Sequence, residues 1–269
     1  MSKPPPLRTL KSLGQHFLVD KGIVRRIAQA AGVRPGDTVL EIGPGRGILT
    51  EILLDMGARV VAVEIDRGLH AYLAERFAEH PELTLHHQDA LKFDPGTIGG
   101  PYKVVANLPY QVTTPLLFHL IQAAPPPTEM VVMIQKEVAV RILAGPDSRQ
   151  YGVLSLGVQA RAQPAMCFTV PPGAFRPPPK VSSAVIRIAP HDTPPVPADQ
   201  VDRFMEVVRA ALGARRKTVR NALGRMGLPS EKIDAALAST GIDPRVRGET
   251  LDLETFRRLT DALVAGEKA

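Results

Sequence analysis

A short glycine-rich turn near the start of the chain is the feature that most constrains its fold. Residues 38–43 read TVLEIG, as expected of a buried strand, residues 44–47 read PGRG, and residues 48–57 read ILTEILLDMG, as expected of a helix. Glycines at such a turn let backbone amides approach a ligand closely, because no Cβ stands in the way. This order of strand, turn and helix is typical of an α/β domain with a ligand site at the carboxyl edge of its sheet.

The alternation continues along the chain. Strands are expected at 58–66, 83–90, 102–110 and 129–135, separated by helical runs. Between residues 151 and 190, the segments CFTVPPGAF and KVSSAVIRIAP predict two more strands, joined by a proline-rich loop and close enough to pair antiparallel. We therefore expect a Rossmann-like α/β domain with a seven-stranded, mostly parallel sheet, an antiparallel last strand and helices on both faces.

A polar, proline-rich segment at 191–200 marks a domain boundary near residue 192. Beyond it the pattern is helical only, with one long helix expected from Val201 to Met226 and two more before the end of the chain. The sequence thus predicts an α/β domain over 1–192, including a basic N-terminal arm, and a small all-α domain over 193–269.

Composition narrows the class of protein. Cys167 is the only cysteine of the 269 residues, so the chain has no intrachain disulfide, and a reducing, cytoplasmic location is expected. No run approaches the 18 or so apolar residues of a membrane span. The net charge is +6, but residues 1–34 and 203–225 each hold seven basic residues against one acidic residue. Two such blocks suggest a polyanionic partner.

Two carboxylates follow the glycine turn at informative positions. Glu64 ends the next expected strand, where it could accept hydrogen bonds from a ribose diol, and Asp89 ends the third, where it could accept from an adenine amine. With Gly43, Gly45 and Gly47, they indicate a nucleoside cofactor, although the spacing GxGxG differs from the GxGxxG of NAD proteins. The simpler alternatives are a turn without a ligand, a surface carboxylate at Glu64 and a helix cap at Asp89.

The segment NLPY (107–110) discriminates between cofactors. It offers the Asn107 side-chain oxygen, the Leu108 or Pro109 backbone oxygen and the Tyr110 ring within four residues. Two acceptors gripping an adenine amine would favour a more reactive nitrogen, and the ring could stack on the base. This predicts direct methyl transfer from S-adenosylmethionine, leaving S-adenosylhomocysteine, rather than a proline turn capped by Asn. His86 and His87 are interpreted as structural, and no metal is expected.

At this point the chain resembles the small-subunit ribosomal RNA adenine dimethyltransferases, nearly end to end. The matching segments are GQHFL (14–18), EIGPGRGILT, VEID, QDA, NLPY, QKEVAVRILAGPDSRQYGVLS (135–155), FRPPPKVSSAVIR (175–187), RRKTVRNAL (215–223) and GIDPRVRGETL (241–251). The resemblance implies cofactor contacts from His16, Leu18, Gly43, Gly45, Glu64, Asp89 and Asn107. It also implies that Phe175 closes over a flipped adenine opposite Tyr110, with core packing as the alternative.

The resemblance further implies an activity. The family dimethylates two adjacent adenosines in a hairpin loop near the 3′ end of 16S ribosomal RNA within the small subunit. Departures occur at His16 and Ser182, where the family often has Asn and Asp. The alternatives left open are an adenine methyltransferase acting on large-subunit ribosomal RNA or DNA, a mainly non-enzymatic assembly factor and, more distantly, an NAD-dependent oxidoreductase.

Contact with RNA is assigned to the second basic block. On one helix from Val201 to Met226, a spacing of 3.6 residues would gather its cations near one face. The RNA-binding residues expected there are Arg209, Arg215, Arg216, Lys217 and Arg220. The protein is expected to act as a monomer.

Overall fold

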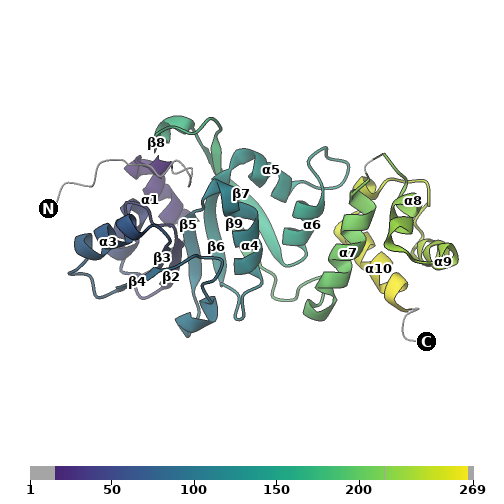
Figure 1. Ribbon diagram of the computed structural model, residues 1–269, viewed down its shortest axis with the longest axis horizontal. Helices are drawn as coiled ribbons and strands as arrows, with labels where there is room; N and C mark the ends of the chain where they lie inside the picture. Colours follow the sequence, from purple (N-terminus) through teal and green to yellow (C-terminus); the bar gives the residue numbers. More distant parts are fainter. Residues whose placement is uncertain (1–15, 215, 266–269) are drawn as a thin grey trace. The chain divides into compact units, whose positions relative to one another are not determined.

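A computed structural model describes residues 16–214 and 216–265 of the chain. These residues form two compact units, shown with their elements in Figure 1. Unit 1 runs to Ala139 and includes Pro164–Pro190, and unit 2 consists of Val140–Gln163 and the chain from His191 onward. The basic N-terminal arm and Arg215 lie outside the described residues.

Unit 1 is built on a seven-stranded sheet. Its strand order is β4-β3-β2-β5-β6-β9-β7. The strands are β2 (Thr38–Ile42), β3 (Arg59–Glu64), β4 (Leu83–His87), β5 (Lys103–Asn107), β6 (Glu129–Gln135), β7 (Ala162–Val170) and β9 (Ser183–Pro190). The strands from β4 to β6 are parallel, and β9 pairs antiparallel with β6. The predicted fold class is confirmed.

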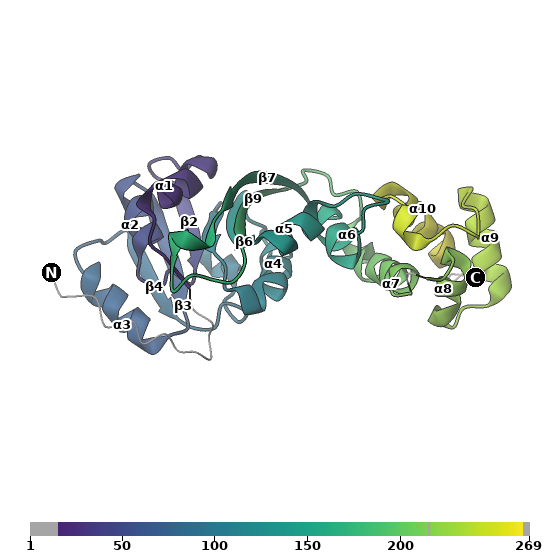
Figure 2. The same ribbon diagram turned by 90° about the horizontal axis from the view of Figure 1, so that it is seen from above.

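Helices cover both faces of this sheet. They are α1 (Lys21–Ala30), α2 (Ile48–Asp55), α3 (Arg67–Arg76) and α4 (Thr113–Ile121), with α5 (Lys136–Leu143) following β6. Asp20 and Asp66 cap α1 and α3 through their side-chain oxygens. Val24 and Leu53 of α1 and α2 share one apolar core with Val39 and Val105 of the sheet. Figure 2 shows α1 and α4 on opposite sides of the sheet.

The strand order creates a crevice at the middle of the sheet. The chain adds β3 and β4 on one side of β2, and then β5 and β6 on the other side. The connections that leave the carboxyl ends of β2 and β5 therefore diverge. In open α/β sheets, ligands bind at such a switch point.

A two-stranded sheet that the sequence did not predict joins two distant segments of unit 1. β1 (Phe17–Leu18) pairs antiparallel with β8 (Phe175–Arg176), and the Val19 amide extends the ladder to the Ala174 carbonyl at 2.9 Å. The two strands lie side by side in Figure 1. This pairing attaches Phe17 and Leu18 to the proline-rich loop between β7 and β9.

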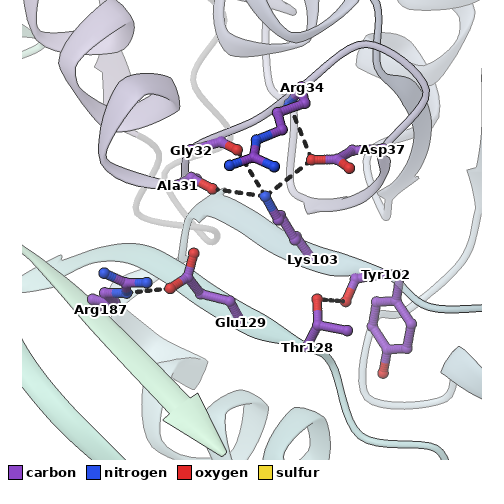
Figure 3. Close-up of polar contacts among 9 residues, drawn as sticks. All are labelled: Ala31, Gly32, Arg34, Asp37, Tyr102, Lys103, Thr128, Glu129 and Arg187. Atoms are coloured by element: carbon purple, nitrogen blue, oxygen red, sulfur yellow. Dashed lines mark hydrogen bonds and ion pairs between the residues drawn. The ribbon is translucent and has the colours of Figure 1, made fainter.

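The amino ends of the strands carry a tightly paired set of polar groups (Figure 3). The Lys103 ammonium donates to the Ala31 and Gly32 carbonyls at 3.1 and 2.8 Å and lies 2.9 Å from the Asp37 carboxylate. Arg187 of β9 pairs with Glu129 of β6. Since the Lys103 charge satisfies carbonyls at the end of α1, it joins that helix to the sheet.

Unit 2 packs α6 (Val153–Gln159), α7 (Val201–Leu212), α8 (Val219–Leu223), α9 (Ser230–Thr240) and α10 (Leu253–Val264) around one core. Tyr151, Leu156 and Ala160 pack in this core with Phe204 and Phe256, and the Tyr151 hydroxyl donates to the Leu251 carbonyl at 3.0 Å. These contacts explain why Val140–Gln163, which the sequence analysis placed in the first domain, belongs to unit 2.

The prediction of a single helix from Val201 to Met226 is wrong. α7 ends at Leu212, and α8 begins only at Val219. Gly213 closes α7, and a Cβ there would lie 2.6 Å from the Arg209 carbonyl oxygen. The Thr218 hydroxyl then caps α8 by accepting from the Asn221 amide.

Within the described residues, no helix combines the length and apolarity that crossing a membrane requires.

Candidate active site

A cavity of about 270 Å³ opens at the carboxyl edge of the sheet in unit 1. Its walls come from the ends of β2, β3 and β5, the turn after β4, and β1. The predicted site residues that line it are His16, Leu18, Gly43, Gly45, Glu64, Asp89, Asn107, Leu108, Pro109 and Tyr110. Segments far apart in sequence therefore meet at the switch point of the sheet.

The three glycines of the turn have different roles. All three have positive φ, at 62° for Gly43, 59° for Gly45 and 74° for Gly47. Gly43 and Gly45 line the cavity, so their bare Cα atoms leave room for a ligand. A Cβ on Gly47 would instead lie 2.6 Å from the Phe77 ring. Gly47 is thus required for packing of the turn against α3.

Glu64 is buried at the end of β3, with both carboxylate oxygens held by backbone amides. Gly45 donates to Oε2 at 3.3 Å, and Asp66 donates to Oε1 at 2.9 Å. Burial raises the pKa of Glu64, and these two hydrogen bonds partly offset the rise. Each oxygen keeps a further lone pair for a donor in the cavity. Asp89 also lines the cavity, and its Oδ1 accepts a hydrogen bond from the Leu91 amide at 3.0 Å.

A second buried carboxyl group, which the sequence analysis missed, lies beneath the glycine turn. Glu41 of β2 is 2% exposed, and its Oε2 accepts from the Thr50 hydroxyl at 2.6 Å. Burial raises the pKa of Glu41 to about 8, with a smaller contribution from the neighbouring Glu64 charge. Glu41 therefore holds its proton at neutral pH.

The NLPY segment presents acceptors at the end of β5. Asn107 Oδ1 is buried, and no donor of the described residues reaches it. The Pro109 carbonyl already accepts from the Val112 amide at 3.2 Å and the Thr113 hydroxyl at 2.9 Å. Within the described part of the chain, no hydrogen bond reaches the Leu108 carbonyl. Of the two backbone oxygens that the sequence left open, Leu108 is the better candidate.

Tyr110 and His16 form part of the same wall. Their ring centroids lie 6.0 Å apart, and the rings are inclined by 32°. The Tyr110 hydroxyl lies 2.6 Å from Ser183 Oγ, and His16 Nδ1 lies 2.8 Å from the Pro177 carbonyl oxygen. Because a carbonyl only accepts, Nδ1 carries the proton of that His16 bond. The His16 ring is thus tied to the loop between β7 and β9, and the Tyr110 ring to the first residue of β9.

Phe175 does not line this cavity. Its side chain is fully buried in the core of unit 1, among residues that include Val24 and Val170. Pairing of Phe175 with Leu18 in the two-stranded sheet orients this segment. The structure therefore places the Phe175 side chain in the core, and its contact with a target adenine stays a prediction.

Sequence reasoning also missed apolar residues of the cavity, among them Phe17 and Ile65. Phe17 packs over the glycine turn, with its ring 3.3 Å from an ideal Cβ on Gly45 and its centroid 5.3 Å from the Arg46 guanidinium carbon. Ile65 lines the cavity while 52% exposed. Phe17 lies between His16 and Leu18, and Ile65 directly follows Glu64. Their position beside these predicted site residues could have indicated that they line the cavity.

The described RNA-binding candidates lie in unit 2, but on different elements. Arg209 is on α7, whereas Arg216 and Lys217 lie between α7 and α8. All three residues are exposed. Arg220 of α8 instead forms a two-pronged ion pair with Asp234 of α9, at 2.6 and 2.8 Å. The pair raises the pKa of Arg220 and lowers that of Asp234. Asp234 therefore partly neutralises the charge of Arg220, which is less available to an RNA phosphate than the charge of Arg209.

His86 and His87 have local partners. The His86 ring lies 5.1 Å from the Phe93 ring, and His87 Nε2 lies 3.2 Å from the Ile65 carbonyl oxygen. Over residues 16–214 and 216–265, no three His, Cys, Asp or Glu side chains cluster as a metal site would require.

Comparison with known proteins gives one consistent result. The family model described as ribosomal RNA adenine dimethylase matches residues 7–264. Ribosomal RNA small subunit methyltransferase A of Moorella thermoacetica is 48% identical over 264 residues, covering 94% of this chain and 92% of that protein. The protein of the same name from Pseudomonas syringae pv. syringae is 46% identical over 259 residues, covering 95% of each chain.

Solved structures agree on the fold. A dimethyladenosine transferase from Plasmodium falciparum superposes with a TM-score of 0.78 at 27% identity, covering 91% of this chain and 96% of that one. The 23S rRNA methyltransferase ErmE superposes with a TM-score of 0.72 at 28% identity, covering 92% and 99%. With its switch-point cavity and its NLPY acceptors, this chain belongs to the ribosomal RNA adenine dimethylase family.

Proposed function

We propose that this protein transfers methyl groups from S-adenosylmethionine to the exocyclic amines of two adjacent adenosines in a hairpin loop near the 3′ end of 16S ribosomal RNA. Each adenosine would become dimethylated. The observation that carries the proposal is the buried Asn107 Oδ1, an acceptor that no donor of the described residues reaches, on the wall of the cavity. A buried acceptor without a partner is costly, so its presence favours a ligand donor.

The residues around the cavity fit S-adenosylmethionine. Gly43 and Gly45 cradle a ligand, Glu64 can accept from a ribose diol, and Asp89 can accept from the adenine amine. His16 and Leu18 lie on the same wall and would contact the cofactor beside Asn107. S-adenosylmethionine, when bound, supplies a methyl group on a sulfonium sulfur. The protein supplies proximity and orientation.

Three groups would hold the target base. Asn107 Oδ1 and the Leu108 carbonyl would accept hydrogen bonds from the two N–H groups of the amine, which favours a pyramidal nitrogen with its lone pair available. The Tyr110 ring offers a stacking face that lines the cavity. Phe175 is not assigned to this step, because its side chain is buried in the core.

Unit 2 would supply affinity for RNA. Arg209, Arg216 and Lys217 are exposed cations, and Arg215 directly precedes Arg216 in the sequence. Exposed cations bind phosphates with an affinity that falls steeply as salt concentration rises. We assign the small ribosomal subunit as the RNA context, because relatives at 48% and 46% identity are named ribosomal RNA small subunit methyltransferase A. A monomer acting in the cytoplasm suffices for this chemistry.

The test is methylation by purified protein with S-adenosylmethionine. Unmethylated small subunits, large subunits and naked RNA are offered in parallel, and nucleosides are identified by mass spectrometry. Dimethyladenosine formed only on small subunits, and absent with Asn107→Ala, is the expected result.

Other outcomes select the alternatives. Methylation of large subunits alone would keep the chemistry and replace the target, an arm motivated by the fold shared with a 23S rRNA methyltransferase. If no substrate is methylated while small subunits still bind tightly, the protein acts as an assembly factor. DNA is included as a further substrate to separate RNA from DNA methylation.

A further inference from the structure

A hydrogen bond outside the cofactor pocket fixes the base-stacking residue. The Tyr110 hydroxyl lies 2.6 Å from Ser183 Oγ, and Ser183 is fully buried at the start of β9. Ser183 is paired with Gln135 of β6, and the Lys136 amide donates to the Ser182 carbonyl at 2.9 Å. The sheet therefore determines where the Ser183 hydroxyl lies.

This bond restricts the Tyr110 ring at the end farthest from its backbone. Tyr110 itself lies in a short 3₁₀ turn, Tyr110–Val112, that directly follows the catalytic acceptors. Burial raises the pKa of Tyr110, and of the two hydroxyl groups in this bond either one can be the donor. With both ends held, the ring presents a fixed face to the cavity.

The two methyl transfers place different demands on that face. An unmodified adenine amine has two N–H groups, one for Asn107 Oδ1 and one for the Leu108 carbonyl. After the first transfer one N–H remains, so the monomethylated base has lost one of its two polar contacts. Stacking on Tyr110 then carries a larger share of base orientation in the second transfer.

We propose that Ser183 is a positioning residue that fixes the Tyr110 ring for the second methyl transfer, and so favours dimethyladenosine over monomethyladenosine as product. The inference rests on the proposed adenine methyltransferase function and deepens it. Ser183 acts only through Tyr110, because it does not line the cavity.

The test measures both transfers for Ser183→Ala, by time courses of mono- and dimethyladenosine on the RNA that the wild type methylates. Loss of a neutral hydrogen bond slows an oriented step by about fivefold. We expect that loss in the second transfer, with the first within about twofold, so monomethyladenosine accumulates. Tyr110→Phe removes the same bond from the other side and should also raise the monomethyl fraction.

The double variant tests whether the two residues act together. Ser183→Ala added to Tyr110→Phe should cause no further change in the ratio of products, because the bond is already absent. Ser155→Ala is the matched control, since Ser155 is an equally buried serine with its hydroxyl bound to the Arg141 carbonyl in unit 2. Its product ratio should equal that of the wild type.

Three results would overturn the proposal. They are an unchanged product ratio in folded Ser183→Ala, an equal loss in both transfers, and additive effects in the double variant. A wild-type protein that methylates no adenine at all would instead overturn the proposed function. The two failures are thus distinguished by the wild-type sample alone.

Discussion

The two ends of strand β5 differ in how completely their polar groups are satisfied. At the amino end, the Lys103 ammonium has three oxygen partners within 3.1 Å: two carbonyls at the end of α1 and the Asp37 carboxylate (Figure 3). At the carboxyl end, only four residues further along the chain, Asn107 Oδ1 is buried without a partner among the described residues. β5 thus runs from a saturated edge, where the polar groups have hydrogen-bond partners, to an unsaturated edge, where a buried acceptor has none among the described residues.

Carboxyl groups at the two edges follow the same division. The hydrogen bond from Lys103 lowers the pKa of Asp37 at the amino edge. Burial raises the pKa of Glu41 and Glu64 at the carboxyl edge. Paired polar groups stabilise the fold, whereas groups that must later contact a ligand cost stability until the ligand arrives. The amino edge of the sheet therefore contributes stability, and the carboxyl edge carries the chemistry.

Replacement of Asn107 tests the unsaturated edge and has the largest expected effect. Asn107→Ala should lower methyl transfer by at least about a hundredfold, as removal of one positioned polar group at a reacting centre does. Its melting temperature should equal or exceed that of the wild type, because the lost oxygen had no partner. Methylation assays and thermal melts on one preparation check both. A marked fall in melting temperature would contradict the comparison.

The next largest effect is expected for Glu41, in the pH dependence of the free energy of unfolding. The unfolded carboxyl group ionises near its ordinary pKa of 4.5, whereas the folded one ionises at about 8. Between these values the folded state binds more protons than the unfolded state, so the free energy of unfolding falls as pH rises. Glu41→Gln should remove that part of the slope. Denaturant melts from pH 5 to pH 8 measure it, and identical slopes in both proteins would rule out a protonated Glu41.

Replacement of Lys103 tests the saturated edge. Lys103→Met removes the Asp37 ion pair and leaves the Ala31 and Gly32 carbonyls without their shared donor. We expect the free energy of unfolding to fall by about 2 kcal/mol. The rate of methyl transfer well below the melting temperature should stay unchanged, because Lys103 does not line the cavity. A loss of activity without a loss of stability would show that the edges are coupled.

Much of unit 1 could be predicted because its elements are locally encoded. The glycine turn, the alternating strands and the helices between them each follow from hydrophobic periodicity and turn residues. The two-stranded sheet of β1 and β8 could not be foreseen, since each strand has only two residues and the pairing spans most of unit 1. Gly213 also escaped notice, because one glycine within a helical pattern is usually tolerated.

The candidate site divides in the same way. Residues in motifs, such as Glu64 and Asn107, were placed near the cavity by the rule that parallel strands end at one edge. Ser183 and Glu41 act through tertiary contacts, which no local pattern encodes. For Phe175 the sequence left two interpretations, and only the tertiary structure shows that its side chain belongs to the same buried core as Val24 and Val170.

The pair of Arg187 and Glu129 should give the smallest effect. The Arg187 side chain is 54% exposed, so water screens its charge, whereas the Glu129 side chain is 11% exposed. Arg187→Met should cost about 1 kcal/mol, chiefly by leaving Glu129 unpaired, and adding Glu129→Gln should recover most of that loss. A double-mutant cycle from denaturant melts measures the coupling. A coupling as large as the whole effect of Lys103→Met would show that the two ion pairs at this edge contribute alike, although the Arg187 side chain is 54% exposed and those of Lys103 and Asp37 are only 21% and 30% exposed.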